Sequence, residues 1–99
     1  MTDPITIEWD DSKNRANLKK HGVRFEEAAS VFSDENARII ADPDHSNEED
    51  RFVILGMSNR LHLLVVCHCY RKEEDAVIRI ISARRADKRE RLLYGAYLT

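Results

Sequence analysis

Three apolar segments in the second half of the chain are separated by short polar links, and this spacing constrains the fold more than any other feature. Each segment is rich in β-branched residues, as expected of strands. Links of three to five polar residues are typical of antiparallel hairpins. The sequence therefore predicts a β-meander. Its strands are residues 51–57, 61–70 and 76–82, joined by residues 58–60 and 71–75.

The residues before the meander predict a short strand, two helices and another short strand. Residues 5–9 alternate between β-branched and polar side chains, which indicates a strand. A helix over residues 12–20 would end at Gly22, which can adopt the left-handed conformation. Apolar side chains at helical spacing in residues 25–32 predict a second helix. Residues 37–41 read as a strand within an otherwise polar, acidic connection.

The end of the chain predicts a helix that begins at Asp87. Asp87 can cap this helix while Glu90 bonds back to it, and an apolar stripe follows. The predicted fold class is therefore α+β: an antiparallel sheet of about four strands, with the N-terminal helices and the C-terminal helix packed against one face. A chain of 99 residues has room for one domain, residues 1–99.

The charge of the chain is divided between its halves, although the formal net charge is only −2. Residues 1–50 hold 13 acidic and 6 basic side chains, and residues 51–99 hold 5 acidic and 10 basic ones. The two halves can pair with each other, or they can form a separate surface for a polyanion; the sequence leaves both open. The N-terminus has no secretory leader and no segment is long and apolar enough to span a membrane, so we expect a cytoplasmic protein.

Cys67, His68 and Cys69 invite a comparison with zinc sites, but their spacing favours packing. On a strand, the two thiols share one face and His68 projects from the other. No second ligand pair has the spacing of a zinc site. With three glycines in total, the chain also has no glycine-rich phosphate loop. We therefore expect neither a metal nor a cofactor.

A basic segment, residues 79–91, joins the last strand to the last helix. It carries six of the sixteen Lys and Arg residues, in a chain whose net charge is negative. Cations gathered at one junction are typical of a surface that binds polyanions. This segment is the first place to look for a function.

Two motifs stand in an order and at a distance that are specific to one protein family. They are K-H-G-V-x-F-E-E-A at residues 20–28 and R-I-I-S-A-R at residues 79–84. With them, residues along nearly the whole chain resemble the BrnT toxins of BrnT/BrnA type II toxin–antitoxin systems. Arg24, Asn36 and Asp87 depart from the family pattern. The further matching residues are Glu8, Trp9, Asp10, Lys13, Asn17, Val31, Phe32, Asp34, Asp50, Arg51, Gly56, Ser58, Leu61, Val65, Val66, Arg71, Ala86, Glu90 and Tyr94.

The resemblance implies a RelE-like fold and a metal-independent endoribonuclease that arrests translation. It also implies neutralisation by a BrnA-like antitoxin with a ribbon-helix-helix DNA-binding domain, in a complex of two toxins and two antitoxins. Through the antitoxin, such a complex binds operator DNA and represses its own operon.

Cleavage of RNA without a metal needs cations that hold the phosphate and stabilise the charge of the transition state. Arginine suits this task because its planar guanidinium binds phosphate bidentately and stays charged. We expect Arg79 and Arg84 to take this role. The alternative for Arg79 is an ion pair with Asp50 or another acid. The side chains expected to bind RNA are Arg51, Arg60, Arg71 and Tyr70; for the arginines, an ion-paired surface role is the alternative.

Proton transfer needs a group that titrates near neutral pH, and histidine is the first candidate. His21 lies at a predicted helix end, where capping the helix is the alternative role. Lys20 and Glu90 are further candidates for the general acid or base, with the capping box as the alternative for Glu90. His62 and His68 share one face of a predicted strand, and each is a base or a half-buried strand residue.

Two functions of different classes compete for the basic segment. The first is an RNA-cleaving toxin with an antitoxin partner, and the second is a non-catalytic module that binds nucleic acid or an acidic protein. A silenced toxin that is kept as a partner in transcriptional repression is a third possibility. Substitution of Arg79 and Arg84 separates an enzyme from a binding module, because only an enzyme loses RNA cleavage.

Overall fold

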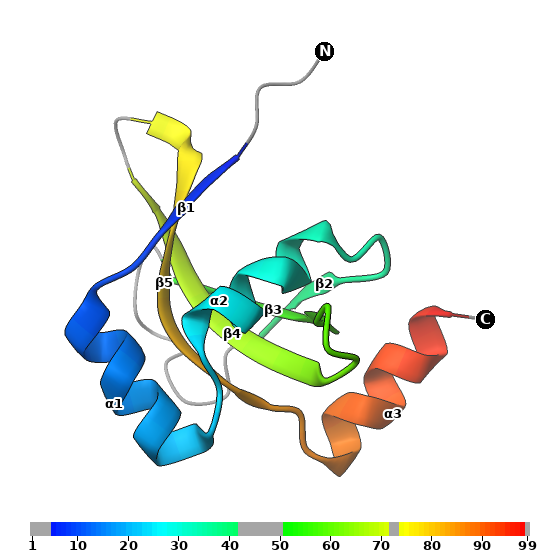
Figure 1. Ribbon diagram of the computed structural model, residues 1–99. Helices are drawn as coiled ribbons and strands as arrows, with labels where there is room; N and C mark the ends of the chain where they lie inside the picture. The colour runs from blue at the N-terminus through cyan, green and yellow to red at the C-terminus, as the bar shows by residue number, and fades with distance from the viewer. Residues whose placement is uncertain (1–4, 42–50, 72–73, 99) are drawn as a thin grey trace.

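Five strands form one sheet in the order β1-β5-β4-β3-β2 (Figure 1). The computed structural model describes residues 5–41, 51–71 and 74–98. Three α-helices and a short 3-10 helix, η1, complete this part of the chain. The elements are β1 Thr6–Glu8, α1 Asp11–His21, α2 Phe25–Ala29, η1 Ser30–Ser33, β2 Arg38–Ile40, β3 Phe52–Met57, β4 Leu63–Arg71, β5 Glu74–Arg85 and α3 Lys88–Tyr97.

The predicted meander is confirmed, since β3, β4 and β5 pair as antiparallel neighbours, and β2 extends them by pairing with β3. The expected sheet of about four antiparallel strands is wrong in one respect. β1 joins the far edge and runs parallel to β5, so the sheet is mixed and has five strands. The three-residue strand β1 pairs with β5, the last strand in the sequence. A local sequence pattern cannot reveal so distant a partner.

The strand β5 is longer than predicted, and this changes the place of Arg84. Ala83, Arg84 and Arg85 continue the ladder by pairing with Val66, Val65 and Leu64 of β4. A register shift between Cys67 and His68 precedes this stretch. Arg84 therefore lies within the strand and not beyond its end. Because side chains alternate along a strand, Arg84 and Arg85 project from opposite faces of the sheet.

The sheet buries side chains on both faces, so the prediction that all helices pack on one face is wrong. Adjacent residues of β3 and β4 belong to two separate clusters. We call the face that packs against α2 and η1 the α2 face, and the face that packs against α3 the α3 face. The α2-face cluster contains Val23, Phe25, Ala28, Val31, Ile54, Leu64, Val66, Ile80 and Ala83. The α3-face cluster contains Val53, Leu55, Val65, Cys67, Ala86 and Tyr94.

Capping residues that are recognisable in the sequence set the boundaries of α1 and α3. Asp10 accepts a hydrogen bond from the Lys13 backbone at the start of α1, and Gly22 ends the helix with a φ of 72°. The expected capping box of α3 is present, with Asp87 and Glu90 each bonded to the other's backbone. The predicted second helix begins at Phe25 as expected but tightens into η1 at Ser30, whose hydroxyl donates to the Glu27 carbonyl.

No helix in the described ranges is long and apolar enough to cross a membrane.

Two glycines provide a test of how tightly β3 packs against η1. A Cβ atom on Gly56 would lie 2.7 Å from Val31 Cγ1 and 2.9 Å from Ala37 Cβ, whereas one on Gly95 in α3 would meet nothing within 4 Å. We expect Gly56→Ala to lower the free energy of unfolding by about 1–3 kcal/mol through overpacking. Gly95→Ala, the matched control, should raise it by up to about 1 kcal/mol, because alanine is the better helix former.

Urea unfolding of both variants, followed by circular dichroism, measures the two changes. Equal stability of Gly56→Ala and the unmodified protein would show that η1 yields easily to the added methyl group.

Candidate active site

A groove of about 290 Å³ lies between α1 and β5. Its helix wall is formed by residues at positions three and four apart, which face the same way on an α-helix. Its floor comes from β5, where Ser82 pairs with Cys67 and so lies on the α3 face. We call this hollow the α1–β5 groove. Its lining residues are Lys13, Ala16, Asn17, Lys20, His21, Ile81 and Ser82.

Asn17 holds α1 against β5. The parallel pairing of β1 ends at Glu8 and Arg79, so the next residues of β5 have no strand on that side. The side-chain amide of Asn17 takes the place of a strand: Nδ2 donates to the Ala83 carbonyl at 2.8 Å, and Oδ1 accepts from the Ala83 N–H at 3.0 Å. Nδ2 also donates to the Val23 carbonyl at 3.0 Å. The amide is buried, and its bonds fix one wall of the groove.

The local sequence pattern predicts no role for Asn17 beyond its match to the family. A signal was present, because asparagine is a poor residue for a helix interior and sits here in the middle of α1. Such a residue persists when its amide has fixed partners in the folded protein.

Cations surround the end of the groove where His21 lies. Burial lowers the pKa of His21 below its ordinary value, and the nearby charges of Lys20 and Arg84 lower it further. The imidazole therefore favours the neutral form, which can accept a proton. His21 is also the last residue of α1, so the alternative role in the last helical turn is compatible with its position.

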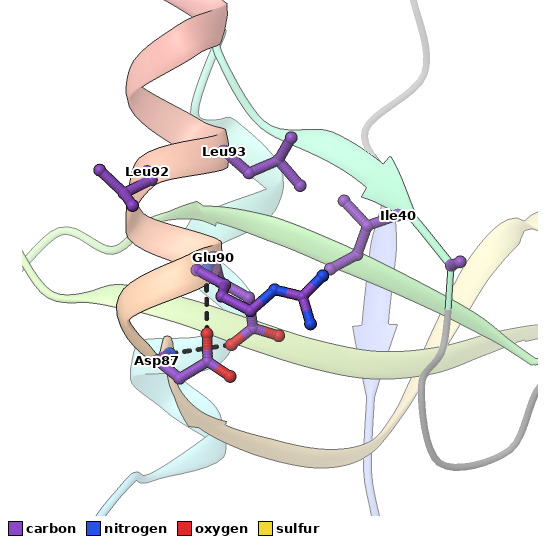
Figure 2. Close-up of a pocket in the computed structure, with 7 residues that line it drawn as sticks. Ile40, Asp87, Glu90, Leu92 and Leu93 are labelled. Carbon is purple, nitrogen blue, oxygen red and sulfur yellow. Dashed lines mark hydrogen bonds between the residues drawn. The ribbon is translucent and has the colours of Figure 1, made fainter.

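Arg84 is held in place by Glu90. Its two terminal nitrogens donate to the two carboxylate oxygens at 2.8 and 2.9 Å. The Glu90 carboxylate also accepts from the Asp87 backbone at 2.8 Å, as the dashed lines of Figure 2 show. The hydrogen bonds from Arg84 keep the pKa of Glu90 below its ordinary value, so it is an acceptor. The capping-box alternative for Glu90 is confirmed.

Arg79 lies on β5 five residues before Arg84, where the pairing with β1 ends. It pairs with Glu8 at 3.8 Å, and Arg71 of β4 approaches the same carboxylate at 3.2 Å. The alternative of an ion pair for Arg79 is thus present, although the partner is Glu8; Asp50 lies outside the described residues. Arg79 and Arg84 are five residues apart on one strand, or about 16 Å. Each pairs with a different carboxylate, Glu8 for Arg79 and Glu90 for Arg84, so the two guanidinium groups do not meet at one point.

The other side chains expected to bind RNA do not gather at the groove. Arg51 is exposed just before β3, and Arg60 is exposed in the turn between β3 and β4. Arg51 is separated from β5 by β4, and Arg60 lies near Glu27 of α2 and does not line the groove. Tyr70 is 38% exposed and contacts the rings of Phe52 and His68. Of the expected set, only Arg71 is near one of the proposed phosphate ligands, through its shared partner Glu8.

His62 and His68 lie on the α2 face; His45 lies outside the described residues. His62 Nδ1 is 2.8 Å from Glu27 Oε2. His68 is fully buried, with its ring 4.9 Å from that of Phe32, and burial lowers its pKa. Cys67 belongs to the α3-face cluster, so Cys67 and His68 project oppositely, as predicted. In the described part of the chain, no group of three or more His, Cys, Asp or Glu side chains could hold a metal ion.

A second, larger hollow of about 630 Å³ lies between β2 and α3. Figure 2 shows Ile40 facing Leu93 across it, with Asp87 and Glu90 at the start of the helix. Leu92 and Leu93 are 68% and 42% exposed, and the carboxylates are occupied by the capping box. This hollow is apolar and offers no group for proton transfer.

Comparisons with known proteins agree with the α+β fold. The crystal structure of the Brucella abortus ribonuclease toxin BrnT matches with a TM-score of 0.64 and 24% sequence identity, over 85% of this chain and 99% of the other. This likeness shows a shared fold. The comparison with curated proteins gave no match. A family model described as "Ribonuclease toxin, BrnT, of type II toxin-antitoxin system" matches residues 9–90. Because that model spans most of the chain, the protein belongs to the BrnT family of ribonuclease toxins of type II toxin–antitoxin systems.

Proposed function

We propose that the protein is a metal-independent endoribonuclease with a RelE-like fold, and that the α1–β5 groove is its active site. The observation that carries this proposal is that Lys20 and His21 line the groove together, while burial and the charges of Lys20 and Arg84 lower the pKa of His21. A neutral imidazole can accept a proton, while the cations beside it bind the phosphate.

In the proposed reaction, the 2′-hydroxyl of the RNA attacks the adjacent phosphorus atom. His21 accepts the hydroxyl proton, while Lys20 and Arg84 stabilise the negative charge of the phosphorane. The bond from phosphorus to the 5′-oxygen breaks, and that oxygen takes a proton from the Lys20 ammonium group. The products are a 2′,3′-cyclic phosphate and a 5′-hydroxyl. No metal ion enters any of these steps.

The other site residues support the reaction from outside the scissile phosphate. Glu90 is a positioning residue, because its carboxylate holds both terminal nitrogens of Arg84. Arg79 and Arg71 would hold a phosphate farther along the RNA, since they lie at the opposite end of the exposed strip of β5. Arg51, Arg60 and Tyr70 would contact RNA outside the groove.

The pH dependence of cleavage tests the role of His21. A general base must be deprotonated, so kcat/KM should rise with pH and reach half its maximum below pH 6.5, about the ordinary pKa of histidine. In His21→Gln, the rate should fall by about 100-fold and the acid limb should vanish. A midpoint at or above pH 6.5, or an acid limb that His21→Gln retains, would show that His21 is not the base.

The folded fraction has to be measured at each pH in this experiment. His68 has a lowered pKa in the folded protein, so the unfolded chain binds more protons below about pH 6.5. The free energy of unfolding therefore falls as the pH decreases in that range. Rates corrected for the folded fraction report the chemistry alone.

The runner-up function is a non-catalytic module that binds RNA or an acidic protein through the same cations. At one end of β5, Arg71 and Arg79 share the single carboxylate of Glu8, and the surplus positive charge there favours binding of a polyanion without any proton transfer. The two functions differ in one observable. A module binds RNA and leaves it intact.

We further propose that the protein acts in the cytoplasm, inhibits translation, and is neutralised by a BrnA-like antitoxin with a ribbon-helix-helix domain. Two toxins and two antitoxins would form the complex that binds operator DNA and represses the operon. The family to which the chain belongs supports the existence of an antitoxin. The exposed Leu92 and Leu93, beside the basic Lys88 and Arg89, give α3 the mixed character of a protein interface.

Expression of the chain with and without its antitoxin tests this part of the proposal. Induction of the chain alone should arrest growth and degrade RNA, and co-expression of a neighbouring ribbon-helix-helix protein should restore both. Normal growth with abundant, folded protein and no antitoxin present would contradict a toxin function.

A further inference from the structure

A second cluster of polar side chains lies on the α2 face, away from the groove. Glu27 Oε2 is 2.8 Å from His62 Nδ1 and accepts a hydrogen bond from Ser58 Oγ at 2.6 Å. On the other side of the ring, His62 Nε2 is 3.2 Å from Nη2 of Arg85. The cluster thus joins α2, the turn between β3 and β4, and the end of β5.

The contacts fix the tautomer of His62. A guanidinium group can only donate, so Nε2 of His62 is the acceptor for Arg85. The proton of the neutral ring is then on Nδ1, which donates to Glu27. The Ser58 hydroxyl organises the same turn, since it lies 3.2 Å from the backbone nitrogens of both Arg60 and His62. The ring is 32% exposed, so Nε2 is close to solvent.

A purely structural role accounts for part of this cluster. The bonds from Ser58 and His62 to Glu27 tie the turn to α2. They do not account for Arg85. Among the side chains of residues 5–41, 51–71 and 77–98, its guanidinium has no carboxylate partner. An exposed arginine that faces the basic nitrogen of an imidazole has donors available for an acceptor from outside.

The charge of the cluster favours an anion as that acceptor. Burial alone would raise the pKa of Glu27, but hydrogen bonds from Ser58 and His62 and the charge of Arg60 hold it below its ordinary value. Glu27 is therefore ionised, and Arg60 and Arg85 together outweigh it. An oxygen placed between Arg85 and His62 would accept from the guanidinium and from an imidazolium whose other N–H stays bound to Glu27.

We propose that His62 and Arg85 form a second phosphate-binding site, which holds a backbone phosphodiester of RNA away from the bond that is cut. Binding at this site rests on hydrogen bonds and charge, and no covalent bond between heavy atoms changes. Glu27 is a positioning residue that holds the ring. Because Arg84 and Arg85 project from opposite faces, RNA that reaches both sites passes the end of β5. The choice of RNA as the ligand rests on the proposed function.

A short oligodeoxythymidylate is the probe, because it has the phosphodiester backbone but no 2′-hydroxyl that could react. The imidazole resonances of His62 are followed by NMR at constant neutral pH during the titration. We expect the resonance of the His62 Cε1 proton to shift as the probe binds, because a phosphodiester then lies beside the ring. Arg85→Gln should weaken the dissociation constant about tenfold, as expected for loss of one charge-assisted contact.

Arg15→Gln is the matched control, since Arg15 is an exposed arginine of α1 and lines neither site. It should bind like the unmodified protein. His62→Gln keeps a neutral polar side chain and should lose affinity as Arg85→Gln does. The proposal is overturned if His62 stays still at saturation, if Arg85→Gln binds as well as Arg15→Gln, or if the probe does not bind. None of these readouts depends on RNA cleavage, so they separate this site from the groove.

Discussion

Replacing Asn17 with alanine is expected to lower the free energy of unfolding by about 3 kcal/mol or more. The substitution removes three hydrogen bonds of a buried amide. It leaves the N–H and carbonyl of Ala83 and the carbonyl of Val23 without these partners, and Ala83 and Val23 are each 1% exposed. An unpaired buried group costs about 1–3 kcal/mol.

Thermal unfolding measures this effect, with an expected fall in the melting temperature of roughly 12–24 °C. Asn17→Asp separates hydrogen bonding from packing, because it keeps the shape but turns acceptors toward two carbonyl oxygens. It should be at least as destabilising as the alanine. Lys19→Ala, on the exposed side of α1, should stay within about 0.5 kcal/mol of the unmodified protein. An Asn17→Ala protein as stable as Lys19→Ala would mean that α1 does not depend on this amide.

Replacing Lys20 with alanine is expected to reduce RNA cleavage by about 100-fold without loss of stability. In the proposed mechanism, this residue supplies both a charge for the phosphorane and a proton for the leaving oxygen, and loss of one such donor typically has an effect of this size. Lys20 is exposed on α1, and alanine is a better helix former, so the fold should be unaffected.

Lys19→Ala is the matched control for this experiment too. The two lysines are neighbours in the last turn of α1, but only Lys20 lines the groove. Both substitutions remove one positive charge, so a general loss of attraction for RNA would affect them equally. A difference between them reports the position of the charge. Equal activities would indicate that the groove is not where RNA is cut.

The sequence predicted most elements of the fold because their signals are local. The link at residues 58–60, the left-handed Gly22 and the capping box of Asp87 each act within a few residues, and the structure contains all three. The second predicted link, residues 71–75, is shorter than expected, because β4 includes Arg71 and β5 begins at Glu74. The pairing of β1 with β5 depends on residues about 70 positions apart, so no local pattern contains it. The placement of α3 on its own face was missed for a similar reason, because the strands are apolar on both sides.

The candidate site was predicted in part, through the kinds of residues it needs. The charges of Lys20 and Arg84 both act on His21, although 64 positions separate Lys20 from Arg84. The expected partnership of Arg79 with Arg84 did not follow, because both lie on one extended strand. Asn17, which holds the groove together, received no role because the value of a buried amide depends on partners that the fold alone supplies.

The most direct test of the central claim is an end-group analysis of RNA incubated with the purified protein, Lys20→Ala and Lys19→Ala in the presence of a metal chelator. The mechanism predicts that the unmodified protein and Lys19→Ala cut the RNA and leave 2′,3′-cyclic phosphates and 5′-hydroxyls, while Lys20→Ala leaves it nearly intact. Uncut RNA with the folded, unmodified protein, or fragments that end in 3′-hydroxyls, would contradict it.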